Sequence, residues 1–165
     1  MNRRQALKAS VAAVTGASIA SVTLAGSNED GSQASLDTVM ALMSAMGSGD
    51  MDAMANLMAD DMVWMNEGDP NIPWIGPWEG KEAIFGFLGI FSQNFQTTKW
   101  VNTDILASGD TVAIFGDMNG ITTKSGKEIG DFTFALRAKV RNGQVVLWNW
   151  FEDSFAVSQA YNDQP

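Results

Sequence analysis

The dipeptide Asn142-Gly143 restricts the fold of this chain more than any other short feature of its sequence. It separates two runs of alternating residues, and both of its positions tolerate the positive φ angles that a two-residue type I′ hairpin turn requires. We therefore predict two antiparallel strands, at 128–141 and 144–153, joined by this turn. Pairing Arg141 with Gln144 at the turn then sets the register of the whole hairpin.

Counting outward from the turn gives the hairpin two unlike faces. The mainly apolar face would hold Phe132, Phe134, Leu136, Ala138, Leu147 and Phe151. The other face would interleave charge with tryptophan, in the order Asp131, Thr133, Arg137, Lys139, Trp148, Trp150 and Glu152. Alternation alone favours the apolar face as core and the mixed face as solvent-exposed, but it does not decide which face lines a cavity.

The residues before the hairpin predict three helices and three more strands. Strands are expected at 99–107 and 111–121, and a short strand at the start of 61–91. Helical spacing of Leu36, Val39, Met40 and Met43 predicts a first helix, which ends by Gly47 or Gly49. Asp50 is suited to cap a second helix that carries a stripe of methionines, which would either face the core or form an adaptable groove.

The segment 61–91 combines a strand, a loop rich in Pro, Gly and Trp, and an apolar third helix. Trp64 and Asn66 alternate on one face of the strand, and Trp74 and Trp78 lie in the loop. The helix is predicted from Ile84, Phe87, Leu88 and Phe91, which recur at helical spacing. Such a mixture is typical of the wall of an apolar cavity.

Composition excludes several kinds of chemistry. The 165 residues include neither Cys nor His, so the chain offers no disulfide, no thiol nucleophile, no imidazole base and none of the usual zinc ligand sets. We therefore predict no metal site and no cofactor, and proton transfer would fall to a carboxylate, Tyr161, lysine or water. Beyond residue 26 the chain carries 7 basic and 19 acidic groups, a net charge of −12, which argues against binding to nucleic acid.

The first 26 residues have the order of an export signal. Arg3, Arg4 and Lys8 precede an uncharged run rich in Ala, Ser, Val and Thr, which ends in small residues near Ala25. The Arg3-Arg4 pair resembles a twin-arginine signal, while a general secretory signal or an ordinary soluble helix would be the alternatives. We expect a periplasmic or secreted protein, cut after Ala20 or Ala25 and free of the membrane afterwards, with a linker at 27–33 and one domain at 34–165.

The order of these elements resembles the SnoaL-like domains of the nuclear transport factor 2-like superfamily. The resemblance is carried by GDMDAMANLMADDMVW, by IPWIGPWEGKEAI and by NGQVVLWNWFEDSF. It implies an α+β fold in which a cone-shaped, curved antiparallel sheet packs against about three N-terminal helices and encloses a pocket. It also implies that the face with Trp148, Trp150 and Glu152 lines the pocket, and that the opposite face forms a dimer interface.

The resemblance does not carry a named activity. Trp64-x-Asn66 is similar to the Tyr-x-Asn with which limonene epoxide hydrolase holds its attacking water, but Asp117-x-Asn119 and Trp150 stand where that enzyme has its Arg-x-Asp and its second Asp. Ketosteroid isomerase needs a carboxylate base, for which Glu67 or Asp69 is near the right place, and a Tyr and an Asp that this chain lacks there.

The candidate site residues follow from these comparisons and from the tryptophans. Glu152 is the preferred proton-transfer group, since desolvation beside Trp150 would raise its pKa, with Arg137 and Asn66 orienting a ligand. The remaining candidates for the pocket are Trp64, Glu67, Trp74, Trp78, Asp117, Asn119, Thr133, Trp148 and Trp150. We expect a small apolar or carbonyl-bearing ligand, with lyase, isomerase or hydrolase chemistry left undecided against a non-catalytic binding or dimerisation domain.

A homodimer is expected from the same resemblance. If the cavity uses the tryptophan face, the face with Phe132, Phe134, Leu136 and Phe151 needs cover, and a symmetric dimer supplies it.

Overall fold

The computed structural model describes residues 21–24 and 29–163. Most of the expected export signal therefore lies outside the described residues. The elements in chain order are β1 (Ser21–Leu24), α2 (Glu29–Ser48), α3 (Met51–Leu57), β2 (Met58–Asn66), β3 (Gly76–Glu79), α4 (Lys81–Asn94), β4 (Phe95–Ser108), β5 (Thr111–Thr122), β6 (Phe132–Arg141), β7 (Gln144–Glu152) and α5 (Ser154–Asn162).

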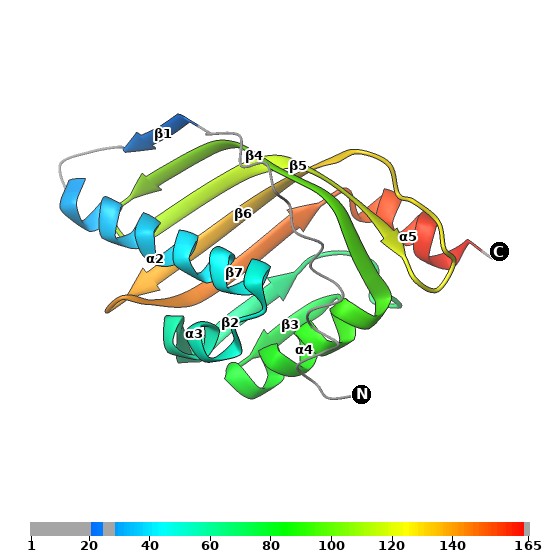
Figure 1. The fold of residues 1–165 in the computed structure, drawn as a ribbon, viewed down its shortest axis with the longest axis horizontal. Helices are drawn as coiled ribbons and strands as arrows, with labels where there is room; N and C mark the ends of the chain where they lie inside the picture. Colours follow the sequence, from blue (N-terminus) through cyan, green and yellow to red (C-terminus); the bar gives the residue numbers. More distant parts are fainter. Residues whose placement is uncertain (1–20, 25–28, 164–165) are drawn as a thin grey trace.

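One mixed sheet organises the domain. Its seven strands lie in the order β1-β4-β5-β6-β7-β2-β3, with β1 parallel to β4, β2 parallel to β7 and the other pairs antiparallel. Helices α2, α3 and α4 lie over one face of the curved sheet, here called the inner face, and α5 follows β7 at one end (Figure 1). The α+β architecture predicted from the sequence is confirmed.

The helices begin where the sequence supplies caps. Asp50 accepts a hydrogen bond from the backbone N–H of Ala53 (3.0 Å) and starts α3, and Asp153 does the same for Ala156 at the start of α5 (3.0 Å). Gly80 precedes α4 with φ of 79°, a conformation that glycine adopts without strain. Helix α2 begins at Glu29, earlier than the domain start predicted at residue 34.

The predicted hairpin turn is confirmed, but the predicted register is wrong beyond its first pairs. Asn142 and Gly143 have φ of 54° and 73°, and Arg141 pairs with Gln144. Val140 then pairs with Val145 while Lys139 pairs with Leu147, so Val146 is an extra residue on β7. Such a β-bulge places every later side chain of one strand on the opposite face from the one expected.

The bulge changes the composition of both hairpin faces. Phe134 pairs with Glu152, Leu136 with Trp150 and Ala138 with Trp148, so the apolar residues of β6 and the tryptophans of β7 share the inner face. The other sheet face, here called the outer face, carries Thr133, Ala135, Arg137, Asn149 and Phe151 instead. Phe132, Phe134 and Leu136 are buried in the core, which corrects the dimer face expected from the sequence.

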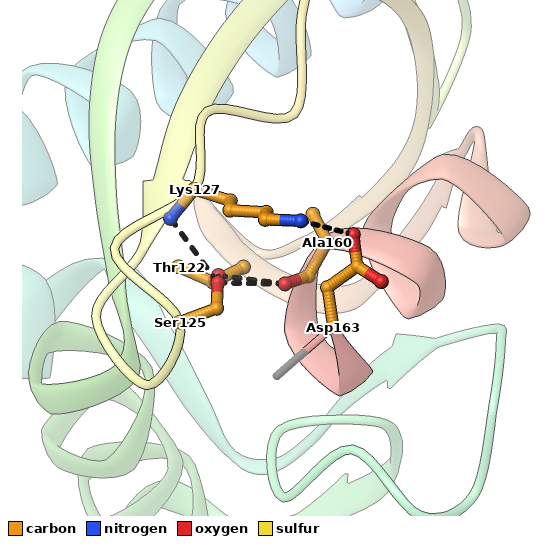
Figure 2. A network of polar contacts seen from close by, with 5 residues as sticks. All are labelled: Thr122, Ser125, Lys127, Ala160 and Asp163. Atoms are coloured by element: carbon orange, nitrogen blue, oxygen red, sulfur yellow. Dashed lines mark hydrogen bonds and ion pairs between the residues drawn. The ribbon is translucent and has the colours of Figure 1, made fainter. Parts of the chain in front are cut away.

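Helix α5 is held against the domain by polar contacts. Figure 2 shows the hydroxyl groups of Thr122 and Ser125 donating to the carbonyl oxygen of Ala160, at 3.2 and 2.7 Å, and Lys127 reaching Asp163 at 2.6 Å. These contacts join the loop between β5 and β6 to the end of the helix. On another side Ser158 donates to Asp69 of the loop between β2 and β3 (2.6 Å), and its hydrogen bond lowers the pKa of Asp69.

Candidate functional site

Three strands repeat one local arrangement on the inner face. Each carries a tryptophan whose indole Nε1–H donates to an acceptor two residues further on, and residues so spaced in a strand share a face. The pairs are Trp64 with Asn66 Oδ1 (2.9 Å), Trp100 with Asn102 Oδ1 (2.8 Å) and Trp150 with Glu152 Oε2 (2.9 Å). A hydrogen-bonded acceptor thus fixes the edge of each of these rings.

The first of these pairs is sealed inside the core. Asn66 accepts from Trp64 and donates its Nδ2–H to the carbonyl oxygen of Trp74 (2.9 Å), and it is buried. The Trp64 ring stacks on Trp148 and tilts against Phe87, both with centroids 5.1 Å away. The rings that were expected to line an open cavity pack on one another and fill the space. Asn66 is therefore a hydrogen-bonded residue of the core and does not face a ligand.

Glu152 lies at the end of β7 and is half-buried. Burial of its carboxyl group raises its pKa from 4.5 to about 6, the hydrogen bond from Trp150 opposes this rise, and the charge of Asp153 adds to it. At neutral pH the group is mostly ionised, but the proton that it accepts is held more tightly than by an ordinary glutamate. This is the behaviour expected of a carboxylate that exchanges a proton with a ligand near neutral pH.

Three aromatic rings form a platform beside Glu152. Phe134 lies 4.6 Å from Trp150 and 4.6 Å from Trp100, and the two indoles are 5.3 Å apart, measured between ring centroids. Gly116 makes room for this cluster, since a Cβ atom there would lie 2.6 Å from the Phe134 ring and 2.1 Å from the carbonyl oxygen of Val101. We call Trp100, Phe134 and Trp150 the aromatic platform.

Asn102 stands on the other side of the aromatic platform from Glu152. The register pairs Asn102 with Gly116, Gly116 with Phe134 and Phe134 with Glu152, so the two polar side chains end one row across four strands. Asn102 and Glu152 are both half-buried, and Asn102 Nδ2 has no hydrogen-bond partner among the residues that the structure describes. The row therefore offers an amide donor at one end and a titratable carboxyl at the other, with apolar rings between them.

Trp100 and Asn102 are not among the residues predicted from the sequence. The signal that could have found them is the repetition of Trp-x-Asn, at 64–66 and again at 100–102. The same pair on two strands indicates that each asparagine accepts a hydrogen bond from the indole two residues before it. The two asparagines differ in exposure, since Asn66 is buried and Asn102 is half-buried.

Three predicted site residues lie on the outer face, and two of them, Asp117 and Thr133, line a groove that Glu152 also borders. Arg137 is exposed, Asp117 is half-buried and Thr133, which pairs with Asp117, is exposed. The structure does not bring Arg137 or Asp117 to the aromatic platform, because the bulge at Val146 places β7 tryptophans opposite the inward residues of β6 and not opposite Arg137.

A shallow groove of about 470 Å³ crosses the outer face at these residues. The outward side chains that line it are Phe115, Asp117, Thr133, Ala135, Phe151 and Asp153, while Gly116, Phe134 and Glu152 border it from within the strands.

The other candidates have structural surroundings. Asn119 donates to Glu128 (2.7 Å) and Asp131 (3.2 Å), and Glu67 is exposed in the loop after β2. Trp74 is buried with its ring at an edge-to-face angle to Tyr161, with centroids 5.3 Å apart.

Trp78 stacks on Phe87, with centroids 5.5 Å apart. The indole N–H groups of Trp78 and Trp148 are buried without a hydrogen-bond partner among the described residues. Each such donor costs about 1 to 3 kcal/mol of stability, so this part of the core is not optimised for stability alone.

The arrangement favours proton transfer by one carboxyl group. Within residues 21–24 and 29–163, no group of three or more acidic side chains is placed to hold a metal ion. Glu152 is the carboxyl whose pKa lies close to neutrality, and it adjoins the aromatic platform, of which Trp100 is the half-buried ring.

Comparisons with known proteins agree with the fold. The model of the SnoaL-like domain matches residues 39–148. A protein of the nuclear transport factor 2-like class from Burkholderia xenovorans LB400 has a similar structure, with a TM-score of 0.72 and 22% identity over 79% of this chain and 98% of that one. No curated protein matches the chain.

Two further solved structures share the fold. A candidate SnoaL-like polyketide cyclase from Jannaschia sp. CCS1 gives a TM-score of 0.69 at 18% identity, covering 86% of this chain and all of that one. A candidate isomerase from Rhodopseudomonas palustris gives 0.65 at 17% identity, covering 76% and 94%. Since the family model matches about two thirds of its sequence, this chain belongs to the SnoaL-like domain family.

Proposed function

We propose that this SnoaL-like domain binds a small, largely apolar molecule bearing a carbonyl or hydroxyl group, and that Glu152 exchanges a proton with it. The apolar part lies against Trp100, the half-buried ring of the aromatic platform, and the polar group lies within reach of Asn102 and Glu152, which are also half-buried. The observation that carries this proposal is the position of Glu152, a half-buried carboxyl with a pKa of about 6 beside Trp150.

A single titratable group suits an isomerase better than a hydrolase. A carboxylate can remove a proton from carbon next to a carbonyl group and return the same proton to another carbon, without a second acid or base. Hydrolysis would also need a group that positions water, and Asn66, the expected candidate, is occupied by Trp64 and Trp74. The Asn102 amide can donate to the carbonyl oxygen on which negative charge develops.

The structural neighbours support this class of ligand. They include the candidate polyketide cyclase and the candidate isomerase, and also TerC, which was co-crystallised with polyporic acid and has a TM-score of 0.67 at 18% identity.

Proton exchange with a bicyclic ketone tests the proposal. The protein is incubated with 2-tetralone in deuterated buffer, and deuterium entry next to the carbonyl group is followed by nuclear magnetic resonance. We expect exchange above the buffer rate that increases as pH rises through about 6, because the ionised form of Glu152 is the base. Glu152→Gln should abolish the increase, whereas the matched control Glu79→Gln, on exposed β3, should retain it.

Binding separates the two remaining interpretations. If Glu152→Gln and the unchanged protein bind the ketone equally, as followed by tryptophan fluorescence, but neither exchanges protons, the domain is a non-catalytic binding protein. Absence of binding to both proteins, together with the buffer rate of exchange, would refute the proposed site for this class of ligand.

Export through the N-terminal segment is a separate part of the proposed function. It is supported by Arg3, Arg4 and the uncharged run that follows. Expression of the full chain should give a periplasmic product cut after Ala20 or Ala25, as measured by intact mass. A cytoplasmic product of full length that is insensitive to Arg3-Arg4→Lys-Lys would refute the proposal.

A further inference from the structure

The groove on the outer face is about as wide as one aromatic ring. Phe115 of β5 and Phe151 of β7 are 43% and 42% exposed, and Ala135 of β6 pairs with both of them. The short side chain of Ala135 therefore lies at the floor of the groove, between two phenylalanines. Because neighbouring strands lie about 4.8 Å apart, the backbones of β5 and β7 are roughly 10 Å apart, which leaves space for a flat ring over Ala135.

Charges of opposite sign lie on the two sides of this ring position. On one side Thr133, two residues before Ala135, pairs with Asp117, and Asp153 lines the same end of the groove. On the other side Arg137, two residues after Ala135, shares its strand face and lies about 7 Å along the strand. A ligand with one negative group is repelled by the acidic end and attracted by Arg137, so its orientation in the groove is determined.

Arg137 and Asn149 place two hydrogen-bond donors side by side. Arg137 is exposed and makes no ion pair within the part of the chain that the structure describes, whereas Lys139 on the same strand face pairs with Asp110 at 3.2 Å. Asn149 pairs with Arg137 across the strands, and its Nδ2 is buried without a hydrogen-bond partner among the described residues. Residues paired in this way have Cα atoms about 4.5 to 5.5 Å apart, and the Cβ–Cγ torsion of asparagine is soft, so one acceptor group can bind both side chains.

We propose that the outer face binds a small aromatic carboxylate, at a second ligand site across the sheet from the aromatic platform. The ring lies over Ala135 between Phe115 and Phe151, and the carboxylate accepts hydrogen bonds from Arg137 and Asn149. The planar guanidinium group matches the two oxygens of a carboxylate. A linker of two methylene groups between ring and carboxylate spans the step of about 7 Å from Ala135 to Arg137. Ring and charge are needed together, because an exposed ion pair alone contributes little in water.

Titration of the protein with 3-phenylpropionate, followed by nuclear magnetic resonance of labelled alanine methyl groups, tests this site. Ala135 lies at the floor of the groove and Ala113 pairs with Arg137, and both are half-buried on the outer face. Ala138, on the same strand as Ala135, is buried on the inner face and pairs with Trp148. We expect a large shift of the Ala135 methyl signal from the ligand ring, a smaller shift of Ala113 and none of Ala138.

The neutral amide 3-phenylpropionamide and two arginine variants test the charge. The amide keeps the ring and should bind with a dissociation constant about tenfold higher than that of the carboxylate. Arg137→Gln should raise the dissociation constant of the carboxylate by a similar factor and leave that of the amide unchanged. Arg141→Gln removes an exposed arginine whose ion pair is with Asp61 (2.6 Å), and it should leave both constants unchanged.

Four results would overturn the proposal. No shift of Ala135 at any soluble ligand concentration removes the site, and a shift of Ala138 without one of Ala135 places the ligand on the inner face. Equal dissociation constants for the carboxylate and the amide remove the role of Arg137. A shift of Ala135 that follows the concentration of protein and not of ligand means that another copy of the chain covers this face. Circular dichroism checks that the variants are folded, as expected because Arg137 and Arg141 are exposed.

Discussion

Replacement of Glu152 by glutamine should stabilise the folded protein, and only above pH 5. A carboxyl group whose pKa is raised by folding binds its proton more tightly in the folded chain than in the unfolded chain. Between pH 4.5 and about 6 the folded state therefore holds a proton that the unfolded state releases, and stability falls as pH rises through this window. Above this pH window the loss of stability is complete, and it amounts to about 2 kcal/mol, the free energy that corresponds to the rise in pKa.

Glutamine at position 152 removes this loss of stability and keeps the hydrogen bond from Trp150. Its side-chain oxygen can accept from Trp150 as the carboxylate does, and its amide is not charged at any pH. The free energy of unfolding of the variant should match that of the unchanged protein at pH 4 and exceed it by about 2 kcal/mol at pH 8. Other carboxyl groups, such as Asp69 with its lowered pKa, titrate in both proteins and cancel in the comparison.

Urea unfolding at a series of pH values measures the difference. Glu79→Gln is the control, since it makes the same chemical change at an exposed side chain. A constant difference for Glu152→Gln between pH 4 and pH 8, or a variant that is less stable at pH 8, would show that Glu152 is not desolvated and would remove the basis of the proposed site.

Three further predictions concern contacts on which the fold depends. Gly116→Ala should destabilise the protein by about 2 kcal/mol or more, because a Cβ atom there would lie 2.1 Å from a backbone oxygen. Gly47→Ala, where a Cβ atom would have nothing within 4 Å, should not destabilise it, and urea unfolding of the two variants compares them. Asn66→Ala should cost about 2 to 3 kcal/mol by leaving a buried indole and a buried carbonyl unpaired, and an unchanged midpoint would contradict this. Asp69→Ala should speed amide hydrogen exchange in α5, because the hydrogen bond from Ser158 to Asp69 is lost, and it should not change exchange in β5.

Element types were predictable from the sequence because they depend on short-range signals. Asp50 caps the helix that it was expected to cap, and Asn142-Gly143 forms the expected turn. These predictions rest on hydrogen bonds and φ angles that the residues themselves determine.

The candidate site was less predictable because one residue decides which side chains meet. Val146 bulges within a run of apolar residues, where an inserted position leaves no trace in the alternation. The expected register placed Glu152 on the same face as Arg137, and the bulge separates them. Glu152 kept its predicted pKa behaviour, because burial beside Trp150 follows from residues two apart on the same strand and does not depend on the register.

The short strand β1 forms one edge of the sheet, next to the cleavage positions expected from the sequence. Residues Ser21 through Leu24 of β1 pair with Asp104 through Ala107 of β4, so β1 covers a stretch of backbone that would otherwise be the outermost edge of the sheet. If the proposed leader is removed after Ala20, the mature chain keeps this cover. If the leader is removed after Ala25, β1 is lost with it and the uncovered edge of β4 can pair with strands of other molecules. The cleavage site would then decide whether the mature protein tends to aggregate.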